Sequence, residues 1–255
     1  MRLLVTVLAA LATTSAPARP AAQLFVTALD TRPGVAAETD VDLTLAAPTT
    51  TADVYVPPGY TIDLAERPGT VLGTARANVA STLVVAGPGL WQATGVTVTA
   101  DRTDVGGYRL EYALARPVRE IDLDLERGLA NPPKGIATWQ AAVGDGIEAR
   151  SVVAFPQSLT VRATLARGEL RATGRLLFAG NPRAGVNVHL AVATQSDLQD
   201  ARKLGTARTD AQGRYRLTAR LARRQDLLIA YVNFYAAGSE SVSPPPSQIV
   251  ALGPG

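Results

Sequence analysis

The chain has 255 residues, of which 47% are hydrophobic and 5% aromatic, and it carries a formal net charge of +3 with one histidine and no cysteine. Without cysteine, disulfides, thiol nucleophiles and thiolate metal sites are excluded. A chain of this length buries about 70% of its unfolded surface, so a hydrophobic core alone can stabilise it.

The net charge divides unevenly along the chain. Residues 23–156 contain 16 acidic and 10 basic residues, a net charge of −6, whereas residues 157–255 contain 6 acidic and 13 basic residues, a net charge of +7. The basic half could attract acidic polymers such as wall teichoic acids, or anionic lipid. Because its basic residues are spread over several segments without interleaved aromatics, we expect an ordinary solvated surface instead.

The first residues have the pattern of a secretory signal peptide. Arg2 supplies a positive charge, residues 3–12 form a short apolar run, and residues 16–18 (Ala-Pro-Ala) are small enough for cleavage. We predict a signal peptide over residues 1–18, with Ala22 as the alternative cleavage position. The apolar run is about half of the roughly 20 residues that a retained membrane-spanning helix needs. We therefore expect a secreted or extracellular bacterial protein without a transmembrane anchor after cleavage.

Alternation of apolar and polar residues dominates the first half after this segment and predicts β-strands. These strands are expected at residues 24–29, 40–45, 53–56, 71–79, 82–86, 96–99, 108–114 and 120–125. Glycine and proline pairs separate them as turns. Residues 136–143 and 147–155 are typical of a β-hairpin around Gly144-Asp145-Gly146. Pro156 then marks the end of a first domain over residues 23–156.

A second set of strands is predicted within residues 157–240, the expected second domain. These strands are expected at residues 159–165, 169–178, 186–192, 203–208, 214–220 and 227–235. Residues 196–203 predict the one short helix, with Ser196 as its N-cap. Residues 241–255 are rich in serine and proline, which predicts a flexible tail with at most a short strand at residues 248–252.

Many short strands with almost no helical periodicity predict the fold class. We expect an all-β protein with two tandem immunoglobulin-like (Ig-like) β-sandwich domains after a cleaved signal peptide. The bias toward arginine over lysine is typical of the coding of a GC-rich bacterium and bears little on function.

Two motifs mark the second half of the chain, PRAGVNV at residues 182–188 and TDAQGRY at residues 209–215. In the later motif, Asp210 and Gly213 are expected to build a tight turn. Tyr215 then begins the next strand and faces the core.

Together these motifs resemble the carboxypeptidase regulatory-like family of small seven-stranded β-sandwiches. The resemblance covers residues 158–236 at most. It implies a fold but no activity, because one fold serves many functions. The first half is similar to uncharacterised secreted actinobacterial-type proteins at residues 54–60 and 68–73, which implies no activity either.

The single histidine, His189, lies in a strand-like run whose valines and Leu190 share the opposite face. We predict an ordinary solvent-facing residue there. A Ser-His-Asp hydrolase would need this histidine, and the sequence contains no G-x-S-x-G motif to support one. It also contains no phosphate-binding loop, dinucleotide fingerprint or nucleic-acid-binding motif. We therefore expect no enzyme, no cofactor and no nucleic-acid partner.

Acidic residues two positions apart on predicted strands are the stronger candidates for chemistry. Asp122 and Asp124 project from one face of their strand, and Asp40 and Asp42 form a similar pair. Such residues lie about 6–7 Å apart, and a neighbouring strand could complete a cluster that binds Ca²⁺ or, as a third choice, hydrolyses glycosides. A solvated sheet face partly neutralised by arginines ranks ahead of both.

Exposed aromatic side chains could bind sugars by stacking on their rings. Trp91 follows a Gly-Pro-Gly turn and Tyr60 follows a Pro-Pro-Gly turn, so we take these two as the weak ligand-binding candidates. Trp139 lies within an apolar strand and is expected in the core.

Taken together, these observations predict an exported, non-enzymatic β-sandwich protein with a structural or protein-interaction role at the bacterial cell surface. Its partner would be an unidentified protein or a cell-wall polymer. The main alternative is a carbohydrate or cell-wall polymer binding module, and a carboxylate-based hydrolase is the third.

Overall fold

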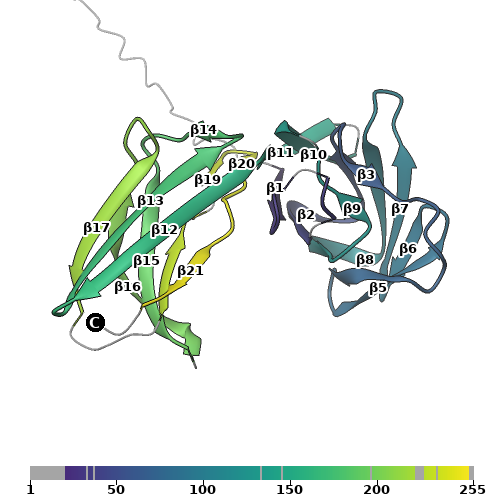
Figure 1. The fold of residues 1–255 in the computed structure, drawn as a ribbon. Coiled ribbons are helices and arrows are strands. Elements are labelled where there is room, and N and C mark those ends of the chain that lie inside the picture. The colour runs from purple at the N-terminus through teal and green to yellow at the C-terminus, as the bar shows by residue number, and fades with distance from the viewer. Residues whose placement is uncertain are drawn as a thin grey trace, which may run out of the picture.

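The structure, a computed structural model, describes residues 21–32, 34–36, 38–132, 134–144, 146–195, 197–221, 227–233 and 235–252. The predicted signal peptide, residues 1–18, lies outside this range. All regular elements of the described residues are strands, which confirms the predicted all-β class. The strands gather in two groups, a first and a second β-sandwich domain (Figure 1).

The first domain is the larger. Its strands are β1 (Ala22–Ala28), β2 (Thr39–Val56), β3 (Thr61–Ile62), β4 (Val71–Arg76), β5 (Ala80–Gly87), β6 (Leu90–Ala93), β7 (Val96–Arg102), β8 (Tyr108–Leu125), β9 (Leu129–Ala130), β10 (Gly135–Val143) and β11 (Gly146–Phe155), joined from far along the chain by β19 (Tyr235–Ala237) and β20 (Glu240–Val242). One sheet has the order β19-β20-β11-β10-β2-β8-β4-β5-β6-β7, with β1 beside β2. The predicted hairpin is confirmed as β10 and β11, although Asp145 of its turn lies outside the described residues.

Two long strands, β2 and β8, fold this sheet on itself. Each was predicted as two separate strands, and the structure has one bent strand in each place. The register of the two strands shifts between Thr44 and Thr51. Exposed Pro48 lies in that stretch of β2, and exposed Pro117 lies in the matching stretch of β8. Because proline has no backbone N–H to donate, the ladder is interrupted there and both strands bend.

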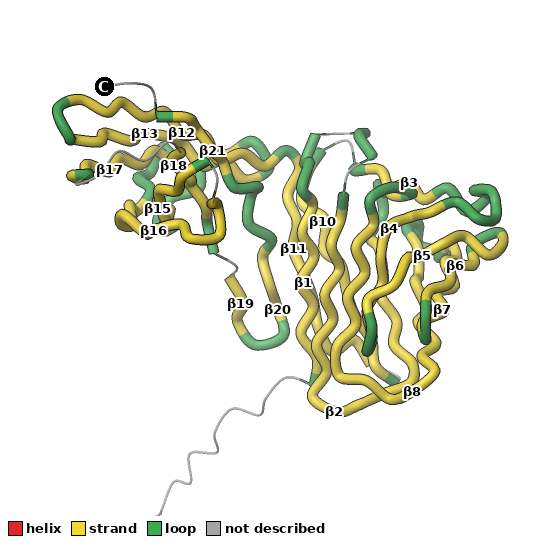
Figure 2. The backbone as a smooth tube through the Cα atoms, turned by 90° about the horizontal axis from the view of Figure 1, so that it is seen from below, coloured by secondary structure: helices red, strands yellow, loops and turns green. Residues whose placement is uncertain are grey.

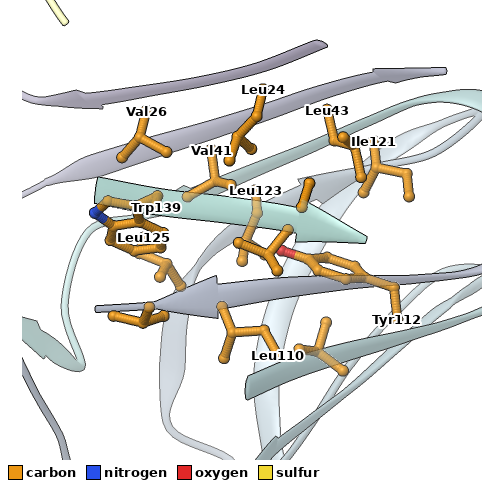
Figure 3. Close-up of a cluster of buried hydrophobic side chains, with 14 of the residues drawn as sticks. Leu24, Val26, Val41, Leu43, Leu110, Tyr112, Ile121, Leu123, Leu125 and Trp139 are labelled. Atoms are coloured by element: carbon orange, nitrogen blue, oxygen red, sulfur yellow. The ribbon is translucent and has the colours of Figure 1, made fainter. Parts of the chain in front are cut away.

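The bend makes each long strand serve two parts of the sheet. The later part of β8 pairs with β4 and its earlier part with β7, so that β4 to β8 close on themselves. Inward-facing side chains of β1, β2 and β8 meet Trp139 of β10 in the enclosed core (Figure 3). Full burial of each large apolar side chain contributes about 1.5–3 kcal/mol.

The second domain is a sandwich of two smaller sheets. Its strands are β12 (Gln157–Ala166), β13 (Glu169–Phe178), β14 (Asn181–Pro182), β15 (Asn187–Thr194), β16 (Asp197–Arg208), β17 (Arg214–Arg220), β18 (Leu227–Tyr231) and β21 (Gln248–Ala251). One sheet joins β12, β13, β14 and β17, and the other has the order β16-β15-β18-β21. Leucine, valine and alanine side chains, with Tyr215, fill the core between them.

The helix predicted for residues 196–203 is wrong. Residues 197–208 form β16, in which Arg202 pairs with Val192 and Thr206 pairs with His189. Ser196, the predicted N-cap, lies outside the described residues. Pairing with β15 satisfies the backbone of this segment, and it outweighs the weak helical preference of a short polar run. The described residues accordingly contain no helix with the length and apolarity needed to cross a membrane.

The flexible tail predicted for residues 241–255 is also wrong where the structure describes it. Ser241 and Ser243 are buried, and Leu252 belongs to the core of the second domain. The short strand anticipated at residues 248–252 is confirmed as β21, which pairs with β18. The serines and prolines of this segment suit a path between two domains, and residues 253–255 lie outside the described range.

Candidate functional site

The chain crosses between the two domains three times. It first passes from β11 into β12, then returns from β18 to the first sheet as β19 and β20, and finally crosses back through three prolines, residues 244–246, to β21. The β19–β20 pair lies between the two groups of strands, beside β11 (Figure 2). Domains joined by one linker move freely by default, whereas these two domains are connected by three segments of the chain.

Buried serines attach the returning strand to the first domain. Ser241 Oγ lies 2.5 Å from the carbonyl oxygen of Leu24 and 2.9 Å from Ser151 Oγ. The backbone N–H of Val26 donates to Ser151 Oγ at 2.9 Å. The hydroxyls therefore link β20, β11 and β1 in a place where unpaired polar groups would be costly.

A second buried contact ties the first crossing to the last one. Thr31 Oγ1 donates to the carbonyl oxygen of Gln157 at 2.9 Å, and the Gln157 backbone N–H donates back to Thr31 Oγ1 at 3.1 Å. Gln157 Nε2 donates to the carbonyl oxygen of Ser243 at 2.9 Å. Each such hydrogen bond contributes about 1 kcal/mol, so this segment is part of the junction rather than a tail.

The acidic candidates do come together on adjacent strands. In the register of β2 and β8, Asp40 faces Asp124 and Asp42 faces Asp122. Partial burial, followed by the charge of the facing aspartate, raises the pKa of both Asp40 and Asp42 to about 6. Arg76 of β4 forms an ion pair with Asp122. The predicted acidic face is therefore real, with partial neutralisation by an arginine of the next strand.

The Ca²⁺ candidates Asp40, Asp42, Asp122 and Asp124 lie in two facing pairs. Among the described residues, no group of three or more histidine, cysteine, aspartate or glutamate side chains is arranged to hold a metal ion. Within each pair, the charge of the facing aspartate adds to partial burial in raising the pKa of Asp40 and Asp42.

The aromatic candidates are in the core, not on the surface. Trp91 is 2% exposed and Tyr60 is 4% exposed. Trp139 Nε1 donates to Tyr60 Oη at 3.1 Å, and the two rings meet edge to face with centroids 5.1 Å apart. The predicted sugar-stacking role of Trp91 and Tyr60 is therefore wrong. The preceding turns direct both side chains inward, because each alternates with outward-facing neighbours.

His189 lies on the outward face of β15, as predicted. Its Nδ1 lies 3.0 Å from Thr206 Oγ1 on the neighbouring strand, and its ring stacks on Tyr231 with centroids 5.3 Å apart. It borders a hollow of about 850 Å³ at the junction side of the second domain, in which Arg183 lies over the ring of Phe178. Partial burial, followed by the charge of Lys203, lowers the pKa of His189, so the neutral ring predominates at neutral pH.

The TDAQGRY motif has the geometry that its residues predict. Asp210 Oδ1 accepts hydrogen bonds from the backbone N–H groups of Gln212 at 2.9 Å and Arg214 at 2.8 Å. Gly213 takes a φ of +71°, which glycine adopts without strain. Tyr215 is buried in the second core. The motif thus builds a turn, and its polar groups are used by that turn.

The basic residues of the second half are scattered along the sequence, but the fold gathers six of them on one charged surface, which we call the arginine face. It is the outward side of the sheet formed by β12, β13 and β17. Its arginines are Arg162, Arg171, Arg175, Arg214, Arg216 and Arg220, all exposed. These residues come from three segments, and only strand pairing brings them together. Arginine at alternate positions of a strand, as in RYRLTAR at residues 214–220, was the available signal.

Comparisons with known proteins give no family. No protein-family model matches the chain, and no curated protein matches it. Among solved structures, the chain is similar to FdeC, an Escherichia coli adhesin, at 14% identity and a TM-score of 0.26, covering 94% of this chain and 66% of that one. It is similar to an alpha-2-macroglobulin fragment from Escherichia coli at 14% identity and a TM-score of 0.25, covering 90% and 97%.

A third similar structure is a Salmonella alpha-2-macroglobulin, at 16% identity and a TM-score of 0.26, covering 92% of this chain and 15% of that one. Superpositions this loose carry no information about activity or partner.

Proposed function

We propose that this chain is an exported, non-enzymatic interaction protein that holds two β-sandwich domains in one arrangement and presents their sheet faces to a partner at the bacterial cell surface. The observation that carries this proposal is the triple crossing of the domain junction, with its buried contacts from Ser241 and Gln157. A protein that only needed two independent modules would need one linker.

Export is supported by the sequence pattern of residues 1–18. The described core begins at Ala22, which is 1% exposed, so removal of residues 1–18 would leave the whole first sheet intact. The proposal places the mature N-terminus at Arg19.

A non-enzymatic role is supported by the use that the fold makes of its reactive groups. His189 is paired with a threonine and stacked on a tyrosine. Asp53 binds Arg109 at 3.0 Å, and Asp210 caps a turn. These groups serve strand faces and turns, whereas catalysis needs a base, a nucleophile and an orienting group directed at one reacting atom.

Membership of the second domain in the carboxypeptidase regulatory-like family is part of this proposal. It is supported by the two-sheet sandwich and by the turn at residues 209–215, in which the N–H of Gly213 donates to the carbonyl oxygen of Asp210 at 2.9 Å. Thr209 is buried, and its Oγ1 accepts from the backbone N–H of Val186 at 2.9 Å, which links the two motifs.

The alternative of a polymer-binding module is favoured by the arginine face rather than by aromatic stacking. The surface role is tested first by fractionating cells that express the chain and sequencing its N-terminus. The proposal expects the protein outside the cytoplasm, beginning at Arg19. A chain that retains Met1 and stays in the cytoplasm would contradict it.

A further inference from the structure

The arginine face concentrates positive charge with little acid beside it. Among the outward positions of β12, β13 and β17, Glu169 is the one acidic residue, and it binds Arg171 at 2.7 Å. In the described part of the chain, the other five arginines of the face have no carboxylate within ion-pair distance. This contrasts with the first domain, where Arg76 and Arg109 each bind aspartates.

Threonines alternate with the arginines in two adjacent cross-strand rows at the centre of the face. In one cross-strand row, Thr173 stands between Arg162 and Arg216. In the next row the order is reversed, and Arg171 stands between two threonines. Adjacent strands lie about 4.8 Å apart, and alternate residues along one strand lie about 6.6 Å apart. The face therefore presents guanidinium groups at short, repeated intervals with hydroxyls between them.

The surface over this face is hollowed rather than convex. Two adjoining hollows of about 440 and 860 Å³ lie over it, and Arg162, Thr173 and Arg216 line both of them. Arg175 and Arg214 line the larger hollow. A long ligand that crosses the strands would contact several arginines at once, which a single small anion would not.

We propose that the arginine face binds a linear polymer whose polyol or sugar units are joined by phosphodiesters, with Arg162, Arg171 and Arg216 at the centre of the contact. This inference rests on the proposed function, because such polymers would be met outside the cytoplasm. The planar guanidinium fork matches two oxygens of a phosphate. A phosphodiester also has two ester oxygens, which a carboxylate lacks, and these can accept further hydrogen bonds from the neighbouring threonine hydroxyls.

Other anionic partners fit the face less well. Binding of single-stranded nucleic acid relies on aromatic platforms for the bases, and the outward positions of these three strands hold no aromatic residue. Peripheral membrane binding adds apolar side chains that enter the lipid boundary. At these positions the apolar residues are Ala166, which is small, and Leu177, which is half-buried beside β14. A phosphodiester chain needs neither.

The test measures binding of the purified chain to poly(glycerol phosphate) by calorimetry at several salt concentrations. Polygalacturonate, an oligothymidylate and phosphatidylglycerol vesicles serve as competing polyanions. The expected result is saturable binding that is at least tenfold tighter for poly(glycerol phosphate) than for each competitor. Affinity should fall as salt rises, because binding releases counterions from the polymer.

Three variants separate the geometry of the face from net charge. The face variant combines Arg162→Gln, Arg171→Gln and Arg216→Gln, and we expect at least tenfold weaker binding. A matched control, Arg116→Gln, Arg119→Gln and Arg127→Gln, removes the same charge from exposed positions of the first domain and should change the affinity less than twofold. Replacing the three face residues with lysine keeps the charge but loses the fork, and binding should weaken severalfold.

Several results would overturn the inference. If the face variant and the control variant lost the same amount of affinity for poly(glycerol phosphate), net charge alone would explain the binding. Tighter binding to the carboxylate polymer, the oligonucleotide or the vesicles would show that the arginine face has another partner. Self-association, with the arginine face of one copy on the acidic face of a second copy, would also contradict the inference. An exported protein that binds none of the polymers contradicts this inference alone, whereas polymer binding by a chain retained in the cytoplasm contradicts the proposed surface role.

Discussion

The two domains use charge and packing differently. In the first domain, acidic residues and arginines are matched across strands, as in the pairs Arg76–Asp122 and Arg109–Asp53, and Trp91 and Trp139 are buried in its core. In the second domain, one sheet face carries six arginines with one acidic partner, over a core in which Tyr215 is the one buried aromatic side chain among the described residues. The first domain therefore pairs charges across its strands, whereas the second leaves positive charge unpaired on one sheet face, and the proposed polymer contact rests on this difference.

Both domains depend on a glycine where two strands approach closely, and replacing it should produce the largest effects. In the second domain, a Cβ added at Gly174 would lie 1.9 Å from the carbonyl oxygen of Thr160. In the first domain, a Cβ added at Gly73 would lie 1.9 Å from the carbonyl oxygen of Asp124. We expect Gly174→Ala and Gly73→Ala each to lower the free energy of unfolding by about 3 kcal/mol, measured by urea denaturation.

Gly87→Ala is the matched control, because nothing lies within 4 Å of its added Cβ and its φ is ordinary. It should change stability by less than about 0.5 kcal/mol. If only one of the two glycine variants were destabilised, the close strand approach in the other domain would be contradicted.

The aromatic core of the first domain predicts a second effect. Tyr60→Phe leaves the buried Nε1 of Trp139 without its acceptor, and an unsatisfied buried donor costs about 1–3 kcal/mol. Thermal unfolding followed by tryptophan fluorescence would measure this loss. Tyr55→Phe, a change at a half-buried tyrosine of the same domain, should have little effect. Equal effects of the two changes would show that the hydrogen bond to Trp139 is unimportant.

The junction predicts a smaller, pairwise effect that links the domains. Ser151→Ala and Ser241→Ala each remove one hydroxyl of a contact 2.9 Å long. In a double-mutant cycle, we expect a coupling free energy of about 1 kcal/mol between the two sites. Additive losses would mean that the two hydroxyls do not interact with each other.

The smallest effect concerns pH and the acidic face. Because the folded chain raises the pKa of Asp40 and Asp42 to about 6, it retains protons that the unfolded chain releases near pH 4. This contribution to stability is complete below about pH 4 and is lost as the pH rises through 6.

Combining Asp40→Asn with Asp42→Asn should remove this part of the pH dependence. The variant should be more stable than the unmodified chain at pH 7, by about 1 kcal/mol or less because solvent screens these partly exposed groups. Urea denaturation at pH 4 and pH 7 measures both values. Asp104→Asn, at an exposed turn, is the control and should leave the dependence unchanged. If the double variant were less stable than the unmodified chain at pH 7, the proposed repulsion between the facing aspartates of β2 and β8 would be contradicted.

Local patterns in the sequence predicted those strands and turns that are determined by residues close together in the chain. Alternation placed β1, β10 and β11, and the TDAQGRY motif predicted its own turn, because the groups that build it are neighbours in the chain. The alternating acidic residues also predicted a charged sheet face. Only the register of β2 and β8 could show that Asp40 faces Asp124.

The failures have long-range causes. Trp91 and Tyr60 follow turns typical of exposed loops, but the direction of a side chain after a turn depends on the strands that pack over it. Ser241 lies in a polar, proline-containing segment, and its burial comes from partners about two hundred residues away, such as Leu24. The arginine face was not predicted, because its arginines are separated in sequence and become adjacent only through strand pairing.

The fixed arrangement of the two domains can be measured directly, because a chain without cysteine accepts labels at chosen sites. Val105→Cys and Ala211→Cys place spin labels on exposed turns of the first and second domains. Pulsed electron-spin distance measurements should give one narrow distribution, and Ser241→Pro, which interrupts β20, should broaden it. A broad distance distribution in the labelled chain that keeps Ser241 would contradict a junction locked by the returning strand. The same conclusion would follow if Ser241→Pro left the distribution unchanged.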